Sequence, residues 1–165
     1  MSDKFVTEWQ SGMPETPCGA GSKVDRTKII RDWLPRMVEK YEIYDINDIG
    51  AGDLNWIGLV DWPHEVDYYP TDVRPRHSDV GWLDIVETIP RKADLCMCFY
   101  VLNHFRKRQD WYAALDNIQQ SGSKYLMMTY ILEDDIPFKM LEDTPLADTG
   151  RHVWAYGIWD LQNEE

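Results

Sequence analysis

The stretch Asn47-Asp48-Ile49-Gly50-Ala51-Gly52-Asp53-Leu54-Asn55-Trp56 carries the clearest signal in the sequence. It overlaps the end of the segment 43–49, which is predicted as a short strand, and its two glycines let the backbone turn sharply where that strand ends. Open α/β sheets bind their ligands at the carboxyl ends of parallel strands. An ordinary glycine turn would look the same, so the surrounding residues have to decide whether this is a ligand site.

Four further segments have the pattern of strands. The segment 95–102 is an almost unbroken apolar run, which is typical of a strand covered on both faces. The others are 65–72, 125–131 and 153–161. Residues 133–151 are predicted as a loop which, with the arm before Lys28, would carry substrate specificity.

Two helices are predicted among these strands. Apolar residues recur at helical spacing from Asp25 onward, and Pro35 either kinks this helix or opens its second half. The second helix covers 111–118, with Asp110 as a possible N-cap and Gly122 just past its end. Strands that alternate with helices in this way predict an α/β fold: a Rossmann-like, open, mostly parallel sheet with helices on both faces.

Composition and charge narrow the class of protein. With 165 residues, 44% of them apolar, the chain is long enough for one domain with a real core. Its net charge of −12 works against binding to phosphate backbones or anionic membranes. No apolar stretch approaches the roughly 20 residues of a membrane span, and the first residues lack the pattern of a secretory signal. We therefore expect a cytoplasmic protein that does not act on membranes and for which nucleic acid is a disfavoured partner.

The chain divides into an arm and one domain. Residues 1–24 are rich in Gly, Pro and Ser, so they are predicted as a flexible arm or lid, and 25–165 as a single domain. The cysteines Cys18, Cys96 and Cys98 are expected to be reduced. The alternative is a zinc site at Cys96 and Cys98, but structural zinc needs a second pair of ligands, and none is evident in the sequence. No metal site is expected.

Acidic residues near the glycine turn point to a nucleoside ligand. A dinucleotide-binding G-x-G-x-x-G motif would need glycine where this chain has Asn55, so a nicotinamide enzyme is disfavoured. Asp48 precedes the turn, where it can fix the loop or receive an ammonium group. Asp72 follows Gly52 by about 20 residues, the separation at which a carboxylate accepts hydrogen bonds from ribose hydroxyls. A solvated loop acid is the alternative for Asp72.

With these residues in place, the chain resembles the class I S-adenosylmethionine-dependent methyltransferases, whose first motif is D-x-G-x-G-x-G. The segment 48–52 matches the first five positions, and Leu54 stands for the last glycine. The chain is still more similar to a small microbial and phage-type branch with D-x-x-x-G-D-x-N-W, whose places are filled by Asp48, Gly52, Asp53, Asn55 and Trp56. The segments 69–75, 83–85, 89–95, 101–105 and 121–126 continue this resemblance in order, so it covers residues 20–160.

The resemblance implies S-adenosyl-L-methionine as the cofactor. Its methionyl part would lie over the two glycines, its ribose against Asp72, and its adenine against Asp84 and Ile85. Trp56 adjoins the turn, with core packing as its alternative, and Tyr100 stands where the branch often has an acid. The cofactor-binding residues expected on these grounds are Asp48, Gly50, Gly52, Trp56, Asp72, Asp84, Ile85 and Tyr100.

Asn103 and His104 follow the segment 95–102 and are the candidate catalytic residues. Histidine is the side chain most easily tuned as a base near neutral pH, so His104 would take a proton from the acceptor. It could equally cap the next helix or pack against Trp111. The expected function is methyl transfer to an unidentified small molecule or protein rather than to nucleic acid. The rival is a regulatory or scaffold module that binds the cofactor without transfer.

Overall fold

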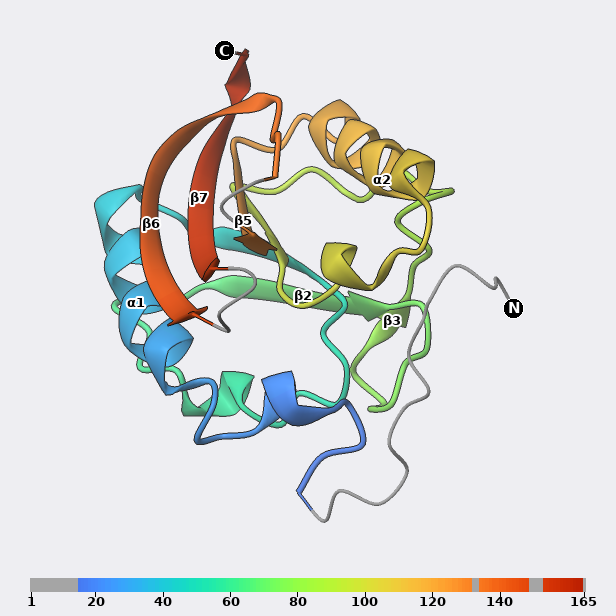
Figure 1. Cartoon of the computed structure of the whole chain (residues 1–165). Coiled ribbons are helices and arrows are strands. Elements are labelled where there is room, and N and C mark those ends of the chain that lie inside the picture. The colour runs from blue at the N-terminus through green and yellow to red at the C-terminus, as the bar shows by residue number, and fades with distance from the viewer. Residues whose placement is uncertain (1–14, 132–133, 149–152, 165) are drawn as a thin grey trace.

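The computed structural model describes residues 15–131, 134–148 and 153–164, which form one sheet with helices packed against it (Figure 1). The helices are α1 (Lys28–Lys40) and α2 (Arg108–Gln120), with short 3₁₀ helices η1 (Ala20–Ser22), η2 (Ile57–Leu59) and η3 (Leu102–His104). The strands are β1 (Asp45–Ile49), β2 (Asp67–Asp72), β3 (Gly81–Trp82), β4 (Leu95–Cys98), β5 (Tyr125–Ile131), β6 (Phe138–Asp148) and β7 (Val153–Glu164). Within these ranges, no helix is long and apolar enough to cross a membrane.

The strand order in the sheet is β3-β2-β1-β4-β5-β7-β6. Strand β7 runs antiparallel to β5 and β6, and the other pairs are parallel. Because β1 pairs with both β2 and β4, the chain builds one half of the sheet outward from β1 and then returns to start the other half at β4. Such a switch point leaves a crevice outside the carboxyl ends of the strands. The predicted open, mostly parallel sheet is confirmed.

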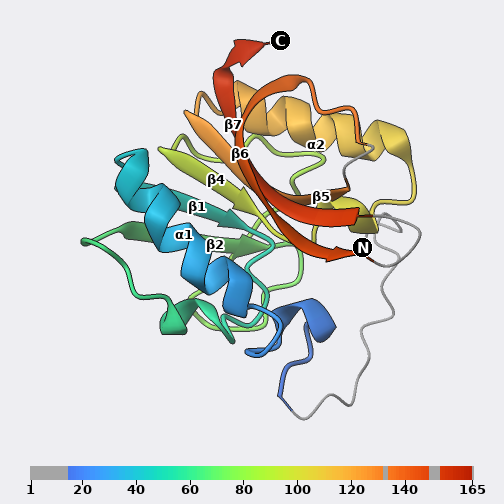
Figure 2. The same ribbon diagram turned by 60° about the vertical axis from the view of Figure 1, so that its left-hand side comes forward.

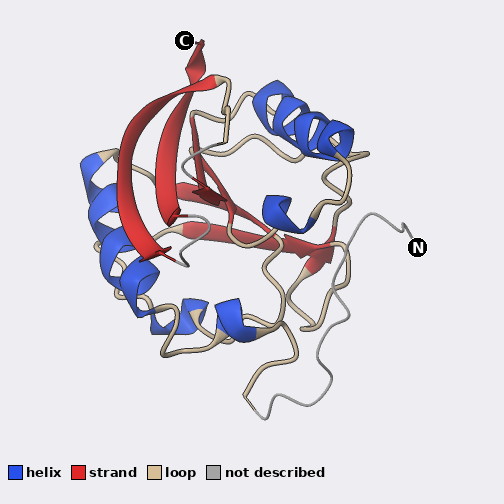
Figure 3. Ribbon diagram, in the orientation of Figure 1, coloured by secondary structure: helices blue, strands red, loops and turns tan. Residues whose placement is uncertain are grey.

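The two α-helices cover opposite faces of the sheet, as Figure 2 and Figure 3 show. Alternation along β5 explains this arrangement, because Met127 packs into the cluster around α1 while Leu126 and Met128 pack into the cluster around α2. Leu34 of α1 and Ile118 of α2 are both fully buried. Truncation of such a side chain to alanine costs about 2–5 kcal/mol. The prediction of helices on both faces is therefore also confirmed.

The predicted strand 95–102 is a strand only in its first half. Strand β4 ends at Cys98, after which the chain turns and enters η3. The prediction was wrong there because Phe99 and Val101 are also buried, so the apolar pattern continues from the strand through a buried turn. Between them, Tyr100 has a φ of 56°, which no strand residue adopts.

The helix ends also differ in detail from the sequence prediction. Helix α1 begins at Lys28 rather than Asp25 and runs through Pro35 without ending. Helix α2 is capped by Lys107, and Asp110 lies in its first turn, where a carboxylate interacts favourably with the helix dipole. Gly122 follows the end of α2 with a φ of 73°, as its predicted role requires.

The loop predicted over 133–151 contains strand β6 instead. This strand lies at the edge of the sheet and pairs only with β7. An edge strand has one free side, so it tolerates charged residues such as Glu142 and a proline such as Pro145. The two-residue strand β3 at the opposite edge was missed as well, because so short a strand leaves no pattern.

Candidate functional site

A cavity of about 370 Å³ lies at the switch point between β1 and β4. Its walls come from the turn after β1, the end of β2, the segment after β3, the turn after β4 with η3, and the N-terminal segment 18–22. Asp48 and Trp56 line a smaller cavity of about 20 Å³ beside it, and Asp84 lines neither cavity. The predicted residues that line the larger cavity are Gly50, Gly52, Asp72, Ile85, Tyr100, Asn103 and His104.

The turn after β1 needs both of its glycines. Gly50 has a φ of 83°, and a Cβ there would stand 2.2 Å from Cγ2 of Val101. Gly52 has a φ of 64°, and its Cβ would stand 2.8 Å from Sγ of Cys18. The amide of Gly50 donates to the carbonyl of Thr71 at 2.8 Å, which fixes the turn against β2. The glycines thus allow two neighbouring segments to approach the turn closely.

Asp72 joins the end of β2 to the glycine turn. Its Oδ2 accepts from the amide of Gly52 at 3.0 Å, and its Oδ1 accepts from the amide of Arg74 at 2.7 Å. Burial raises the pKa of this carboxyl, while the two amide donors and the charges of Arg76 and Arg74 oppose that rise. A buried carboxylate is therefore held in one orientation at the wall of the larger cavity.

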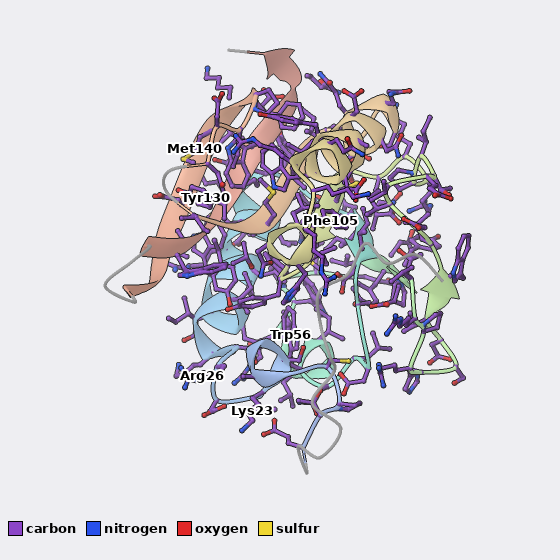
Figure 4. All side chains as sticks on the ribbon, turned by 45° about the vertical axis from the view of Figure 1, so that its right-hand side comes forward. Lys23, Arg26, Trp56, Phe105, Tyr130 and Met140 are labelled. Atoms are coloured by element: carbon purple, nitrogen blue, oxygen red, sulfur yellow. The ribbon has the colours of Figure 1, made fainter. Side chains whose placement is uncertain are left out.

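Asp48 faces the α1 side of the sheet, where it lines the smaller cavity. Its carboxylate accepts a hydrogen bond from the hydroxyl of Tyr68 on β2. Burial raises the pKa of Asp48 to about 7, although the bond from Tyr68 opposes the rise. Trp56 lines the same cavity and lies beside η1 and η2 in Figure 4, with its ring 6.2 Å from that of Phe99. Both predicted residues adjoin the larger cavity without lining it.

Asp84 shapes the segment that follows β3. Its Oδ1 accepts from the amide of Val86 at 3.0 Å, and its carbonyl accepts from the amide of Thr88 at 2.9 Å. These bonds form a turn that directs Leu83 and Ile85 into the larger cavity. Asp84, which was expected to contact the adenine, is thus buried within the turn. The cavity wall at this segment is formed by the apolar residues Leu83 and Ile85.

Tyr100 lines both cavities in a left-handed conformation. Its ring packs against Gly21, where a Cβ would stand 3.1 Å from the ring, and its hydroxyl lies 3.0 Å from that of Tyr156. Its amide donates to Oγ1 of Thr129 at 3.2 Å. Burial raises the pKa of the Tyr100 hydroxyl, so it stays protonated and does not serve as a base near pH 7.

The N-terminal segment is fastened over the glycine turn by side chains. Oγ1 of Thr16 donates to Oδ2 of Asp53 at 2.7 Å. Nδ2 of Asn55 donates to the carbonyl of Ser22 at 2.9 Å and to Oε1 of Glu15 at 3.1 Å. We call these contacts the latch. Through these contacts Asp53 and Asn55 hold the N-terminal segment against the glycine turn. Residues 18–22 of that segment form one wall of the cavity.

Asn103 and His104 stand together on η3 at the edge of the larger cavity. Asn103 is exposed and His104 is half-buried. Burial lowers the pKa of the His104 imidazole below its usual value, so the ring is neutral at pH 7 and able to accept a proton. The alternative that His104 caps the next helix is wrong, because Lys107 caps α2.

Sequence reasoning missed several walls of the cavity. Leu83, Val73, Phe99 and the segment 18–22 all line it. Val73 and Leu83 lie in segments that carry the resemblance, 69–75 and 83–85, but no role at the site was assigned to them. Phe99 and the segment 18–22 belong to no such motif and could be placed at the cavity only through the fold. The described residues contain no cluster of metal-binding side chains, and Cys96 and Cys98 are buried free thiols.

Comparisons by sequence found no matching family model and no matching curated protein. Solved structures do match. The N-methyltransferase NodS from Bradyrhizobium japonicum WM9, in complex with S-adenosyl-L-homocysteine, is 14% identical with a TM-score of 0.62, over 82% of this chain and 87% of that protein. Magnesium protoporphyrin IX methyltransferase from Synechocystis PCC 6803, with bound S-adenosylmethionine, is 10% identical with a TM-score of 0.57, over 82% and 80%.

A third match is the methyltransferase domain of a bacterial Hen1 protein. It is 9% identical with a TM-score of 0.63, over 84% of this chain and 100% of that one. Identities this low carry information about the backbone alone, and three different methyltransferases share this backbone. The chain therefore has the fold of class I S-adenosylmethionine-dependent methyltransferases.

Proposed function

We propose that the chain binds S-adenosyl-L-methionine in the cavity at the switch point and transfers its methyl group to a small molecule, or to a protein, rather than to nucleic acid. The observation that carries the proposal is Asp72, a buried carboxylate that two backbone amides fix at the cavity wall. A carboxylate at the end of this strand is suited to accept two ribose hydroxyls. The shared fold with methyltransferases that hold this cofactor or its product supports the proposal.

The residues around the cavity fit the parts of this cofactor. Each oxygen of Asp72 accepts one amide hydrogen and keeps a further lone pair for a hydroxyl. Leu83 and Ile85 offer apolar walls suited to the faces of a purine ring. A volume of about 370 Å³ falls within the range of small-molecule sites.

The smaller cavity fits an ammonium group. Its volume of about 20 Å³ holds one water-sized group, and Asp48, Tyr100 and Tyr156 offer oxygen atoms around it. With a pKa of about 7, the buried Asp48 is only partly ionised at neutral pH. A neighbouring cation favours the ionised form, so binding of an ammonium group would lower this pKa.

When bound, the cofactor supplies a methyl group on a sulfonium: a lone pair of the acceptor forms the new bond to carbon, the carbon–sulfur bond breaks, and S-adenosylhomocysteine leaves. The chain's main task is to hold the reacting groups in line, which lowers the barrier by several kcal/mol. His104 takes the acceptor's proton where the acceptor carries one, because its imidazole is neutral. Asn103, exposed beside it, orients the acceptor through its amide.

We also propose a branch of the family, a role for the N-terminal segment and a class of acceptor. The ordered motifs between residues 48 and 126 support membership of the small microbial and phage-type branch. The latch supports a lid at the N-terminal side of a single domain, 25–165. A net charge of −12 supports a small-molecule or protein acceptor.

Binding of the cofactor product is the first test. Calorimetry on the whole protein should detect S-adenosylhomocysteine with micromolar affinity and little or no binding of NAD. A preference for NAD would overturn the proposal.

A matched pair of variants then tests the role of Asp72. Asp72→Asn and Asp84→Asn each neutralise a buried carboxyl that holds backbone amides, but only Asp72 lines the cavity. Hydrogen bonds to a charged group contribute about 1.5–3 kcal/mol, so Asp72→Asn should weaken S-adenosylhomocysteine binding about tenfold or more. Both variants should lower the melting temperature, while Asp84→Asn keeps its affinity. Equal affinity in the two variants would remove Asp72 from the site.

Transfer itself is tested with a cell extract and labelled S-adenosylmethionine. Label that becomes attached to a small molecule or a protein, and depends on added protein, supports the enzyme. If product binds but nothing in the extract is labelled, the binding module replaces the enzyme as the better hypothesis.

A further inference from the structure

A second cleft of about 280 Å³ opens beside the switch-point cavity. It lies between η3, the start of α2 and the carboxyl end of β5. Asn103 lines both spaces, so the cleft and the cavity meet at the residue that stands next to His104. A molecule in the cleft would therefore have one end directed toward the cavity in which the methyl donor is proposed to bind.

Aromatic and apolar side chains form the deep part of the cleft. Tyr130, Leu102 and Met128 are buried, and Phe105 and Trp111 are partly buried against the same hydrophobic cluster. Figure 4 shows Phe105 beside η3 and below α2, with Tyr130 on the side of strands β6 and β7. The hydroxyl of Tyr130 donates to Oδ2 of Asp143 at 2.7 Å, so its ring is fixed. Such a lining suits a flat, mostly apolar body.

Three consecutive cations stand at the rim. Arg106, Lys107 and Arg108 are exposed and line the cleft. Nε of Arg108 donates to the hydroxyl of Tyr112 at 3.2 Å, and its guanidinium lies 5.9 Å from the ring of Trp111. Among the residues that the structure describes, Arg106 and Lys107 form no ion pair. Arg106 and Lys107 are thus exposed cations at the rim of a cleft that a single carboxylate, Asp134, also lines, in a chain whose net charge is −12.

Helix stability does not explain these cations. Lys107 is the N-cap of α2 and Arg108 is its first residue. Positive charge at a helix N-terminus is unfavourable because it opposes the helix dipole. The placement costs free energy of folding, so a binding role is the better explanation.

We propose that this cleft binds the methyl acceptor, and that the acceptor is a small molecule with a flat apolar body and an anionic group, a carboxylate or a phosphate, held by Arg106 and Lys107. The proposal rests on the proposed function for the identity of the neighbouring cavity. A volume of about 280 Å³ is at the small end of ligand sites, which favours a compact acceptor. The negative charge of the whole chain opposes a polyanion.

The test uses three probes built on one phenol ring: 4-hydroxybenzoate, 4-hydroxyphenyl phosphate and the uncharged 4-hydroxybenzamide. Binding of each is measured by ligand-observed NMR on the whole protein, both empty and loaded with S-adenosylhomocysteine. The benzoate or the phosphate should bind at least tenfold more tightly than the amide. Whichever acid binds more tightly identifies the anionic group.

A double variant locates the binding. Arg106→Gln with Lys107→Gln should weaken binding of the acid about tenfold or more and leave binding of S-adenosylhomocysteine unchanged. Lys92→Gln with Lys139→Gln is the matched control, because it removes the same charge at exposed positions that line neither cleft nor cavity. The control should bind the acid as the unmodified protein does.

The outcomes separate this proposal from the one on which it rests. It is overturned if no probe binds, if the amide binds as tightly as the acids, or if both double variants behave alike. A short single-stranded oligonucleotide that binds through these two cations while the small acids do not would replace the small molecule with nucleic acid. Failure to bind S-adenosylhomocysteine while the acid still binds would overturn the proposed function alone.

Discussion

The turns after β1 and β4 lie side by side at the wall of the cavity and accommodate left-handed backbone in opposite ways. Gly50 reaches a φ of 83° and Tyr100 a φ of 56°, so both leave their strand through left-handed backbone. One turn has no side chain because Val101 occupies the space that a Cβ would need. The other keeps a large side chain, which Gly21 and Tyr156 hold in place. Strained backbone is thus tolerated either by removing the side chain or by anchoring it.

The largest expected effect comes from giving the first turn a side chain. Gly50→Ala places a Cβ 2.2 Å from Val101 at a positive φ. Left-handed backbone costs about 1–2 kcal/mol and overpacking about 1–3 kcal/mol, so the free energy of unfolding should fall by about 3 kcal/mol. Urea denaturation measures the loss. Val101→Ala in the same chain should recover the packing part, and a double variant no more stable than Gly50→Ala would contradict this account.

The turn after β4 leads to His104, which is proposed to take the proton of the acceptor. His104→Ala should slow methyl transfer by roughly 10²-fold where the acceptor carries a proton, with binding of S-adenosylhomocysteine unchanged. The pH profile of the rate should lose its acidic limb, a change that a structural role would not produce. A lower melting temperature with an unaltered pH profile would make His104 a packing residue.

The stability of the protein should also depend on pH through Asp48 on β1. Burial raises the pKa of Asp48 from 3.8 to about 7, so the folded protein holds this proton more tightly than the unfolded chain does. This contribution to stability is present below about pH 4 and is lost as the pH rises through 7. Asp48→Asn should remove that part of the pH dependence in thermal unfolding. Parallel curves for the two proteins would show that Asp48 titrates normally.

The smallest effect should come from the anchor of the second turn. Tyr100→Phe keeps the ring against Gly21 but removes the hydroxyl that lies 3.0 Å from Tyr156. One hydrogen bond is lost, so the free energy of unfolding should fall by about 1 kcal/mol. Tyr112→Phe, at an exposed tyrosine, is the control and should change stability less. If Tyr100→Phe lost more free energy of unfolding than Gly50→Ala, the turn after β4 would depend more on its anchor than the turn after β1 depends on its glycine.

What could be predicted from the sequence was local. Gly50, Gly52 and Asp72 could be singled out because two glycines after a strand, followed by an acid about 20 residues later, form a recognisable sequence pattern. The left-handed turn at Tyr100 was hidden inside an apolar run. The partner of Asp48, Tyr68, and the bond from Thr16 to Asp53 across 37 residues depend on the fold, so no local pattern shows them. Strand β6 was missed because an edge strand can be polar.

The latch has a consequence for rates. Residues 18–22 form one wall of the cavity, and that wall is held by a handful of side-chain hydrogen bonds rather than by pairing in the sheet. Local opening of such a segment costs far less than unfolding the domain. Where ligand exchange requires this wall to open, association and dissociation should slow together, at nearly constant affinity, as the latch tightens. In that case movement of the N-terminal segment, and not the methyl transfer, sets the rate of turnover.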